Sequence, residues 1–176
     1  HNGCIDTAIK MADLAIKSGA DIIKHQTHFV DDEMSFEAKD MKVGYIGDSI
    51  WNLMKKCSLA KEEEIKLKEF VEDKKITYLS TPFSRSASNF LNDIGVPAFK
   101  IGSGECNNFP LIEHIASFGK PIILSTGMND LKSVDIAVNI MKKKKIKFAL
   151  MHTTNSYPTP DQSVRLGGIL ELKNKY

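Results

Sequence analysis

Residues 98–108 place several chemically capable side chains close together, reading Ala-Phe-Lys-Ile-Gly-Ser-Gly-Glu-Cys-Asn-Asn. Their glycines let a ligand approach the backbone, while Lys100, Ser103 and Glu105 offer a cation, a hydroxyl and a carboxylate. A lysine within an apolar strand is costly unless it faces an anion or a carboxylate. This stretch therefore predicts a binding site at the end of a buried strand.

A second lysine, Lys24, stands in another apolar run, and hydroxyls close two further runs at Thr81 and Ser125. Two strand lysines with several hydroxyls favour an anion site over a structural ion pair, and a phosphorylated carboxylic acid fits this set. The competing enzyme hypothesis is a barrel aldolase in which Lys100 forms a Schiff base. Glu105 either balances Lys100 or acts as a general acid or base, and both interpretations stay open.

Histidines and a proline-rich turn lie at other predicted strand ends. His25, His28 and His152 each lack a carboxylate or second histidine at ligand spacing, so core or supporting roles are preferred to metal binding. Asn155 and Tyr157 stand in Asn-Ser-Tyr-Pro-Thr-Pro and suit the recognition of sugar hydroxyls or an amide. The prolines alone also explain a rigid loop there.

The elements that position these groups alternate between strand and helix. Strands are predicted at 20–28, 76–83, 98–102, 121–126 and 147–153, and helices at 6–17, 50–57, 61–74, 86–93, 110–118, 131–144 and 166–174. The strands are dense in Ile, Leu and Phe and are expected to be buried on both faces. If the first strand alternates, Lys24, Gln26 and His28 share one face and His25 the other. Polar groups at all five strand ends favour a (β/α)8 barrel over a doubly wound sheet.

The expected fold class is therefore α/β, an incomplete (β/α)8 TIM barrel. A complete barrel needs about 250 residues, whereas this chain has 176, and its five strands plus a stub at His1 make six. We expect the last two strands and most of the first to be missing. Residues 1–176 then form a partial barrel domain that is not stable alone.

Composition excludes several function classes. The chain has 24 basic and 22 acidic residues and a net charge of +2, which gives no argument for nucleic acid or membrane binding. The lysine run at 142–145 is expected to be a solvated helix end. Three cysteines without CxxC spacing predict reduced thiols in a cytoplasmic protein. No apolar stretch approaches the roughly 20 residues of a membrane span.

In these residues the sequence resembles the sialic acid synthase family, the N-acetylneuraminate synthases of bacterial type. The motifs that carry the resemblance are HNG at 1–3, KHQTH at 24–28, DEMS at 32–35, STPFSR at 80–85, FKIGSGECNN at 99–108, PLI at 110–112, GKPIILSTGM at 119–128, NSYPTP at 155–160 and VRLGG at 164–168. The resemblance implies a TIM barrel followed by an antifreeze-like domain, absent here, in a domain-swapped homodimer.

The activity that the resemblance implies is a transferase of sialic acid and surface polysaccharide biosynthesis. With a divalent metal, Mn²⁺ or Mg²⁺, it condenses phosphoenolpyruvate with N-acetylmannosamine and gives N-acetylneuraminate and phosphate. This reaction agrees with the anion site and disfavours the Schiff base. The family's two metal-binding histidines lie beyond Tyr176, so no complete metal site and no turnover are expected from this chain alone.

Site residues follow from the resemblance motif by motif. Those implied to hold phosphoenolpyruvate are Lys24, Thr81, Lys100, Ser103, Ser125 and Asn155. Gln26 and Tyr157 are implied to contact the sugar, and Glu105 to transfer a proton, with Lys24 and Lys100 as further catalytic residues. Where relatives carry a sugar-contacting Gly-Asn segment, this chain has Gly44-Tyr45-Ile46-Gly47. The alternatives are therefore a legionaminic or related nonulosonic acid synthase, or a non-catalytic sugar-phosphate-binding fragment.

Overall fold

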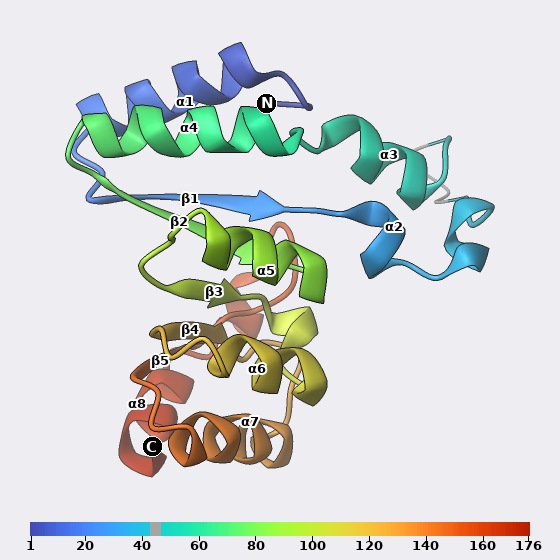
Figure 1. Cartoon of the computed structure of the whole chain (residues 1–176). Coiled ribbons are helices and arrows are strands. Elements are labelled where there is room, and N and C mark those ends of the chain that lie inside the picture. Colours follow the sequence, from blue (N-terminus) through green and yellow to red (C-terminus); the bar gives the residue numbers. More distant parts are fainter. Residues whose placement is uncertain (43–46) are drawn as a thin grey trace. The chain divides into compact units, whose positions relative to one another are not determined.

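The computed structural model describes residues 1–42 and 47–176, which form two compact units, His1–Pro97 and Ala98–Tyr176. The elements of the first unit are α1 (Ile5–Lys17), β1 (Ile22–Thr27), α2 (Val30–Glu33), the 3-10 helix η1 (Phe36–Lys39), α3 (Ile50–Cys57), α4 (Lys61–Asp73), β2 (Thr77–Pro82) and α5 (Arg85–Asp93). Helices α1 and α4 lie side by side (Figure 1). Strands β1 and β2 are parallel, with Gln26 opposite Thr81.

Helix α4 covers one face of this strand pair because its apolar side chains recur at helical spacing. Leu67 and Val71 of α4 are buried, as are Tyr78 and Leu79 of β2. The following helix α5 begins at Ser84, whose hydroxyl accepts a hydrogen bond from the Ala87 N–H at 3.2 Å. Such a cap satisfies one of the donors that a helix N-terminus leaves open.

The elements of the second unit are β3 (Phe99–Ile101), η2 (Ser103–Glu105), α6 (Phe109–Ala116), β4 (Ile122–Ser125), α7 (Leu131–Lys143), β5 (Phe148–Met151), η3 (Asp161–Ser163) and α8 (Gly167–Lys175). The strands β3, β4 and β5 are parallel neighbours, with Lys100 opposite Ile123 and Ser125 opposite Met151. Asn108 and Asp130 cap α6 and α7 through their side-chain oxygens. Both caps start a helix directly after a strand-end loop that carries predicted site residues.

Burial on both faces holds for β2, β3 and β4 but is wrong for β1 and β5. In β1, burial alternates along the strand, and in β5 Ala149 and Met151 are exposed. Helices cover one face of each of these strands, whereas the described residues leave the other face open. The face of β1 that carries Lys24 and Gln26 is the open one.

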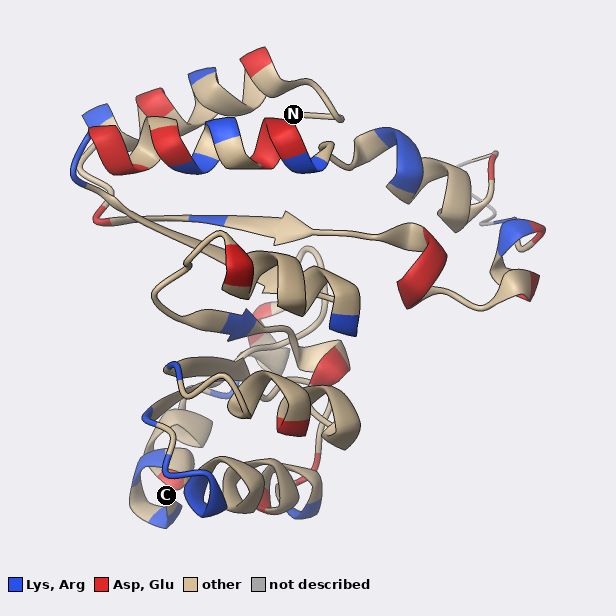
Figure 2. Ribbon diagram, viewed as in Figure 1, with Lys and Arg blue, Asp and Glu red and all other residues tan. Residues whose placement is uncertain are grey.

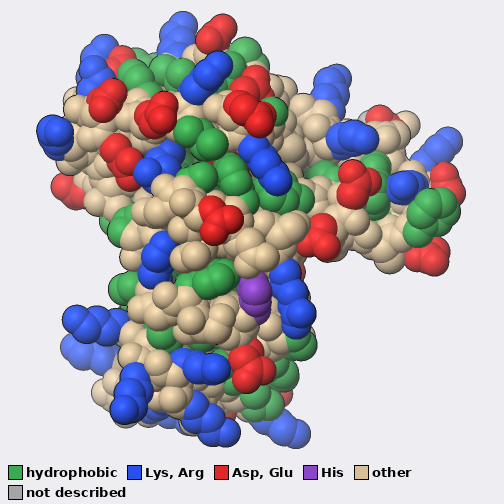
Figure 3. All heavy atoms as spheres, viewed as in Figure 1, with side chains coloured by type: hydrophobic (Ala, Val, Ile, Leu, Met, Phe, Trp, Pro, Cys, Tyr) green, Lys and Arg blue, Asp and Glu red, His purple; other side chains and the backbone are tan. Residues whose placement is uncertain are grey.

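All five predicted strands and seven predicted helices are present, with ends that differ by a few residues at most. The long connection after His28 additionally contains α2 and η1, which the sequence pattern did not predict. The lysines of 142–145 are exposed at the C-terminal end of α7, as expected (Figure 2). On the face of the first unit seen in Figure 3, acidic and basic side chains are interleaved. Among the described helices, none combines the length and the apolar character needed to span a bilayer.

Candidate functional site

The first unit presents Lys24, Gln26 and Thr81 on one face of the β1–β2 pair. Side chains two residues apart on a strand share a face, and Gln26 stands directly opposite Thr81. Lys24 and Gln26 are exposed, whereas Thr81 is buried. The strand thus alternates as predicted, and it brings together a cation, an amide and a hydroxyl.

A cavity of about 400 Å³ lies along β1 and is lined by residues from both of its faces. The residues that line it are His1, Asn2, Lys24, His25, Gln26, His28, Met54 and Cys57. Most of these side chains are polar and can form hydrogen bonds, as recognition of a sugar requires. The HNG and KHQTH motifs therefore meet at one cavity although more than twenty residues separate them.

The opposite face of the strand pair is fixed to α4 by polar contacts. Tyr78 OH donates to Glu64 Oε1 at 2.9 Å. Burial, and then the neighbouring Glu64 carboxylate, raise the pKa of Tyr78 well above its ordinary value. Tyr78 is therefore a permanent hydrogen-bond donor, which helps to hold β2 in one orientation.

In the second unit, Lys100 projects from β3 toward the end of β4. Its side chain is buried, with the residue only 8% exposed, and its Nζ donates to Ser125 Oγ at 2.7 Å and to the Ile101 carbonyl at 2.6 Å. Lys100 and Ser125, both predicted to bind an anion, therefore lie in direct contact. These two hydrogen bonds hold the Lys100 side chain in place at the ends of β3 and β4.

Ser103 belongs to a second hydrogen-bonded group at the same strand ends. Its Oγ is 2.9 Å from Thr153 Oγ1, which also accepts from the Gly127 N–H at 3.0 Å. Asn129 Nδ2 donates to the carbonyls of Ser103 and Gly127, at 2.8 and 2.6 Å. The loops that follow β3, β4 and β5 are thereby held together.

Asn155 packs directly against Gly127. A Cβ atom added to Gly127 would lie 2.1 Å from Asn155 Oδ1 and 2.6 Å from Thr153 Oγ1. Only glycine leaves room for these two side chains, because real Cβ contacts are never this short. The predicted site residue Asn155, in the loop after β5, is therefore positioned against Gly127, in the loop that follows Ser125 and β4.

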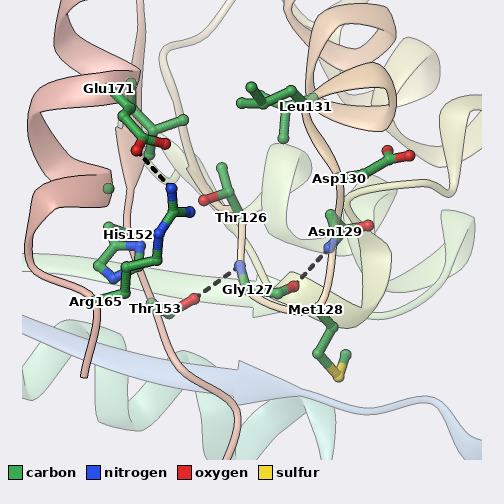
Figure 4. Close-up of a pocket in the computed structure, with 13 residues that line it drawn as sticks. Thr126, Gly127, Met128, Asn129, Asp130, Leu131, His152, Thr153, Arg165 and Glu171 are labelled. Atoms are coloured by element: carbon green, nitrogen blue, oxygen red, sulfur yellow. Dashed lines mark hydrogen bonds and ion pairs between the residues drawn. The ribbon is translucent and has the colours of Figure 1, made fainter. Parts of the chain in front are cut away.

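A cavity of about 270 Å³ lies beside this loop, between the start of α7 and α8 (Figure 4). Thr126, Gly127 and Thr153 line it, and Arg165 reaches across it. The Arg165 guanidinium pairs with Glu171 at 2.5 Å. Because this pairing offsets its charge, Arg165 is a poorer anion ligand than Lys100.

The two remaining predicted site residues lie at the periphery. Glu105, on η2, is partly buried and accepts a hydrogen bond from Asn108 Nδ2 at 2.6 Å. Tyr157 is 93% exposed in the loop after β5. The Gly44-Tyr45-Ile46-Gly47 departure includes residues 43–46, so it lies outside the described part of the chain. The roles of all these residues remain predictions.

Two of the three strand-end histidines have carboxylate neighbours that their spacing did not indicate. His28 Nδ1 is 2.9 Å from Glu33 Oε1, and its ring stacks on Phe83. His25 Nδ1 is 3.5 Å from Glu64 Oε1. Even so, within residues 1–42 and 47–176 no three His, Cys, Asp or Glu side chains are grouped so as to hold a metal ion.

Sequence reasoning missed Thr153, Asn129 and Glu64. Thr153 lies at the end of a predicted strand, as Ser125 does, and that position was a usable signal; Asn129 lies farther along the loop after β4. Glu64 lies in a helix whose charged pattern resembles a solvated surface, yet it is 2% exposed. Nothing in the local sequence distinguishes it from its neighbours, the exposed Glu62 and the half-buried Glu63.

Comparisons with known proteins find relatives along nearly the whole chain. The sequence model of the NeuB family matches residues 11–176. An uncharacterized protein of Methanocaldococcus jannaschii is 38% identical over 99% of this chain and 49% of its own length. The N,N'-diacetyllegionaminic acid synthase of Campylobacter jejuni is 34% identical over 100% of this chain and 55% of its own length.

A solved structure is also similar. The crystal structure of an N-acetylneuraminic acid (sialic acid) synthetase from Leptospira borgpetersenii, in complex with citrate, matches with a TM-score of 0.88 and 34% identity. The match covers 100% of this chain and 58% of that one. The chain spans about half the length of the curated relatives it matches.

Proposed function

This chain belongs to the NeuB family and has the α/β, TIM-barrel-like fold of its synthases, and on that premise we propose that the complete protein is a sialic acid synthase. The proposed reaction joins phosphoenolpyruvate, N-acetylmannosamine and water to give N-acetylneuraminate and phosphate. A cytoplasmic homodimer is part of the same proposal. Residues 1–176 form the part of the barrel that binds phosphoenolpyruvate.

The observation that carries the proposal is the buried contact between Lys100 and Ser125 at the strand ends. Phosphoenolpyruvate has a phosphate and a carboxylate, which require cations and hydrogen-bond donors in a site of limited exposure. The second unit offers Lys100, Ser103 and Ser125 for this purpose, with Asn155 beside Gly127. Lys24 and Thr81 are also proposed to bind phosphoenolpyruvate.

The chemistry assigns different tasks to the remaining residues. Carbon 3 of phosphoenolpyruvate attacks the aldehyde carbon, water adds at carbon 2, and the bond to the phosphate oxygen then breaks. The aldehyde oxygen gains a proton and the water loses one, and Glu105 is the proposed group for such a transfer. Gln26, at the polar cavity of the first unit, and Tyr157 are proposed to bind the sugar.

A divalent metal is part of the proposed reaction. The residues that this structure describes do not form a metal site, because they contain no suitable group of three ligands. We propose that the metal-binding histidines of the complete protein lie beyond Tyr176. The roles given above to Lys100, Ser125 and Ser103 are independent of the metal.

A second acceptor sugar is supported by one observation. The Campylobacter jejuni relative, 34% identical, is an N,N'-diacetyllegionaminic acid synthase. The two candidate products are built from phosphoenolpyruvate in the same way and differ in the sugar. The assignment of the phosphoenolpyruvate side is therefore common to both, and the choice rests on sugar contacts such as Gln26.

The test is a phosphate-release assay on the complete protein with phosphoenolpyruvate and Mn²⁺ or Mg²⁺. N-acetylmannosamine and the diacetamido sugar that leads to diacetyllegionaminic acid are supplied in parallel, and products are identified by mass. We expect phosphate release that depends on one of the sugars. The proposal fails if neither sugar promotes release. Trapping of a sugar adduct on Lys100 by borohydride would instead support the aldolase hypothesis.

A further inference from the structure

Glu64 of α4 is a buried carboxylate at the centre of a polar network in the first unit, 2% exposed. Its Oε1 accepts hydrogen bonds from Thr27 Oγ1 at 2.5 Å and Tyr78 OH at 2.9 Å. Thr27 Oγ1 in turn lies 2.7 Å from Ser80 Oγ. A buried carboxylate requires donors of this kind, and here they come from both β1 and β2.

His25 connects this network to the cavity along β1, which it lines together with His1. Its side chain is 10% exposed, and its Nδ1 is 3.5 Å from Glu64 Oε1 with no closer hydrogen-bond partner. Its Nε2 is 3.0 Å from the Nε2 of His1. The Nδ1 of His1 accepts a hydrogen bond from the Gly3 N–H at 3.1 Å.

The turn that carries His1 is fixed by the end of α3. Gly3 has a positive φ of 75°, and a Cβ atom there would lie 2.2 Å from the Lys56 carbonyl oxygen. Neither the backbone conformation nor the space allows another residue at this position. The Gly3 N–H is therefore held in place as the donor to His1.

These contacts determine where the protons lie when both imidazoles are neutral. Because His1 Nδ1 accepts from Gly3, its proton is on Nε2 and is donated to His25 Nε2. His25 Nε2 is then an acceptor, so the proton of His25 is on Nδ1 and faces the Glu64 carboxylate. Gly3, His1, His25 and Glu64 thus form one polar array. All of its protons point in one direction, from Gly3 through His1 and His25 to Glu64.

We propose that His25, with His1 and Glu64, is a positioning residue that shapes the cavity lined by Lys24 and Gln26. His25 stands between these two residues on β1, and its ring is held on the face opposite to theirs. The hydrogen bond at Nε2 and the nearby Glu64 carboxylate at Nδ1 limit the rotation of the strand, and with it the positions of Lys24 and Gln26 in the cavity lining. The effect on substrates rests on the proposed synthase function, whereas the proton arrangement does not.

Acid disturbs this array in a defined way. A proton taken up by His25 makes both of its ring nitrogens donors, so His1 must accept through Nε2 and carry its own proton on Nδ1. That proton would oppose the Gly3 N–H, and the hydrogen bond between Gly3 and His1 would be lost. The titratable and charged side chains that face the array are Glu64 from α4, Tyr78 from β2, and, around the cavity, Lys24, His28 and Cys57.

The first test is a long-range ¹H–¹⁵N NMR spectrum of the complete protein labelled at histidine, at neutral pH. We expect the Nδ1–H tautomer for His25 and the Nε2–H tautomer for His1, with signals assigned from single substitutions. Lowering the pH should abolish both patterns together and speed exchange of the Gly3 amide. A neutral His25 protonated on Nε2, or one doubly protonated at neutral pH, would overturn the proposal.

The second test compares His25→Ala, His25→Gln and the control Asp21→Asn, an exposed position just before β1. Losing these contacts should raise the KM for the sugar roughly tenfold in His25→Ala, which corresponds to about 1.4 kcal/mol. His25→Gln, whose amide can accept from His1, should recover part of the loss, and Asp21→Asn should match the wild type.

Equal KM values in all variants, or no recovery in His25→Gln, would contradict a positioning role. If His25→Ala does not fold, the NMR spectrum of the wild type decides alone. If the complete protein releases no phosphate with any sugar, the synthase proposal fails. The NMR measurement of the two histidine tautomers is independent of that outcome.

Discussion

At the scale of single residues, Lys100 has the most restrictive surroundings of the proposed anion-binding groups. Its ammonium group is buried and donates to two neutral oxygens, the Ser125 hydroxyl and the Ile101 carbonyl. A cation at a buried position interacts more strongly with an anion than an exposed one does, which supports Lys100 as an anion ligand. Lys24, by contrast, is exposed and can adapt to a ligand.

Lys100→Met in the complete protein should therefore weaken phosphoenolpyruvate binding selectively. The methionine keeps most of the side-chain volume but removes the charge, and a hydrogen bond to a charged group contributes about 1.5–3 kcal/mol. We expect the KM for phosphoenolpyruvate to rise by one to two orders of magnitude, with a smaller change for the sugar. Lys147→Met, an exposed lysine just before β5, is the matched control. An unchanged KM in Lys100→Met would contradict the assigned role.

The close packing around Gly127 leads to a second prediction for a single residue. In Gly127→Ala the new methyl group would meet Asn155 Oδ1 and Thr153 Oγ1 at distances that no structure tolerates, so Asn155 must move. We expect weaker phosphoenolpyruvate binding and retained folding, measured by steady-state kinetics and circular dichroism. Gly167→Ala is the control, because no atom lies within 4 Å of a Cβ there. Equal kinetics of the two variants would show that Asn155 is not a ligand.

At the scale of elements, the start of α5 is joined to α2. Asp32 Oδ2 accepts hydrogen bonds from the Ser86 hydroxyl at 2.7 Å and the Ser86 N–H at 3.2 Å. The DEMS and STPFSR motifs are thus in contact, and the carboxylate lies at the N-terminus of a helix, where negative charge is favourable. The contact between Asp32 and Ser86 therefore helps to hold in place the loop that follows β2, the strand that carries Thr81.

This contact predicts a pH-dependent contribution to stability. Hydrogen bonds from Ser86, first its hydroxyl and then its backbone, hold the pKa of Asp32 below the ordinary value of 3.8. The stabilisation is therefore complete above the unfolded pKa and is lost as the pH falls through the lower, folded pKa. From about pH 5 downward the wild type should lose more stability than Asp32→Asn. Urea unfolding at several pH values measures the difference, and Asp31→Asn is the control; parallel curves would contradict the prediction.

At the scale of the whole molecule, the sequence predicted the order and type of the main elements and the pleat of β1. Lys24 and Gln26 alternate with His25 because a strand has a period of two, which needs no tertiary information. The contact between Lys100 and Ser125 also followed from strand ends meeting at one edge of a parallel sheet.

Contacts between distant elements could not be predicted. Glu64 pairs with Thr27, 37 residues earlier, and only the packing of α4 on β1 and β2 brings them together. Likewise, the sequence does not show that Asn129 bonds to Ser103 or that His25 lies between His1 and Glu64. Periodicity tells which face a residue occupies, but not which helix covers that face.

The position of Cys57 gives the molecule an internal reporter of ligand occupancy. Its thiol lines the same cavity as Lys24 and Gln26, whereas the two other cysteines lie elsewhere. Hydrogen bonding from Thr7 lowers the pKa of the exposed Cys4, and burial raises the pKa of Cys106 to about 11. Iodoacetamide should therefore alkylate Cys4 fastest and Cys106 slowest.

Saturating phosphoenolpyruvate and sugar should slow alkylation of Cys57 and leave that of Cys4 unchanged, as followed by peptide mass spectrometry of the complete protein. Equal rates at Cys57 with and without substrates would place them outside this cavity. Because the thiols need no introduced label, one native protein sample contains a fast reference, a slow reference and a probe. The cavity at β1 can thus be footprinted chemically, for any candidate sugar, before its turnover is known.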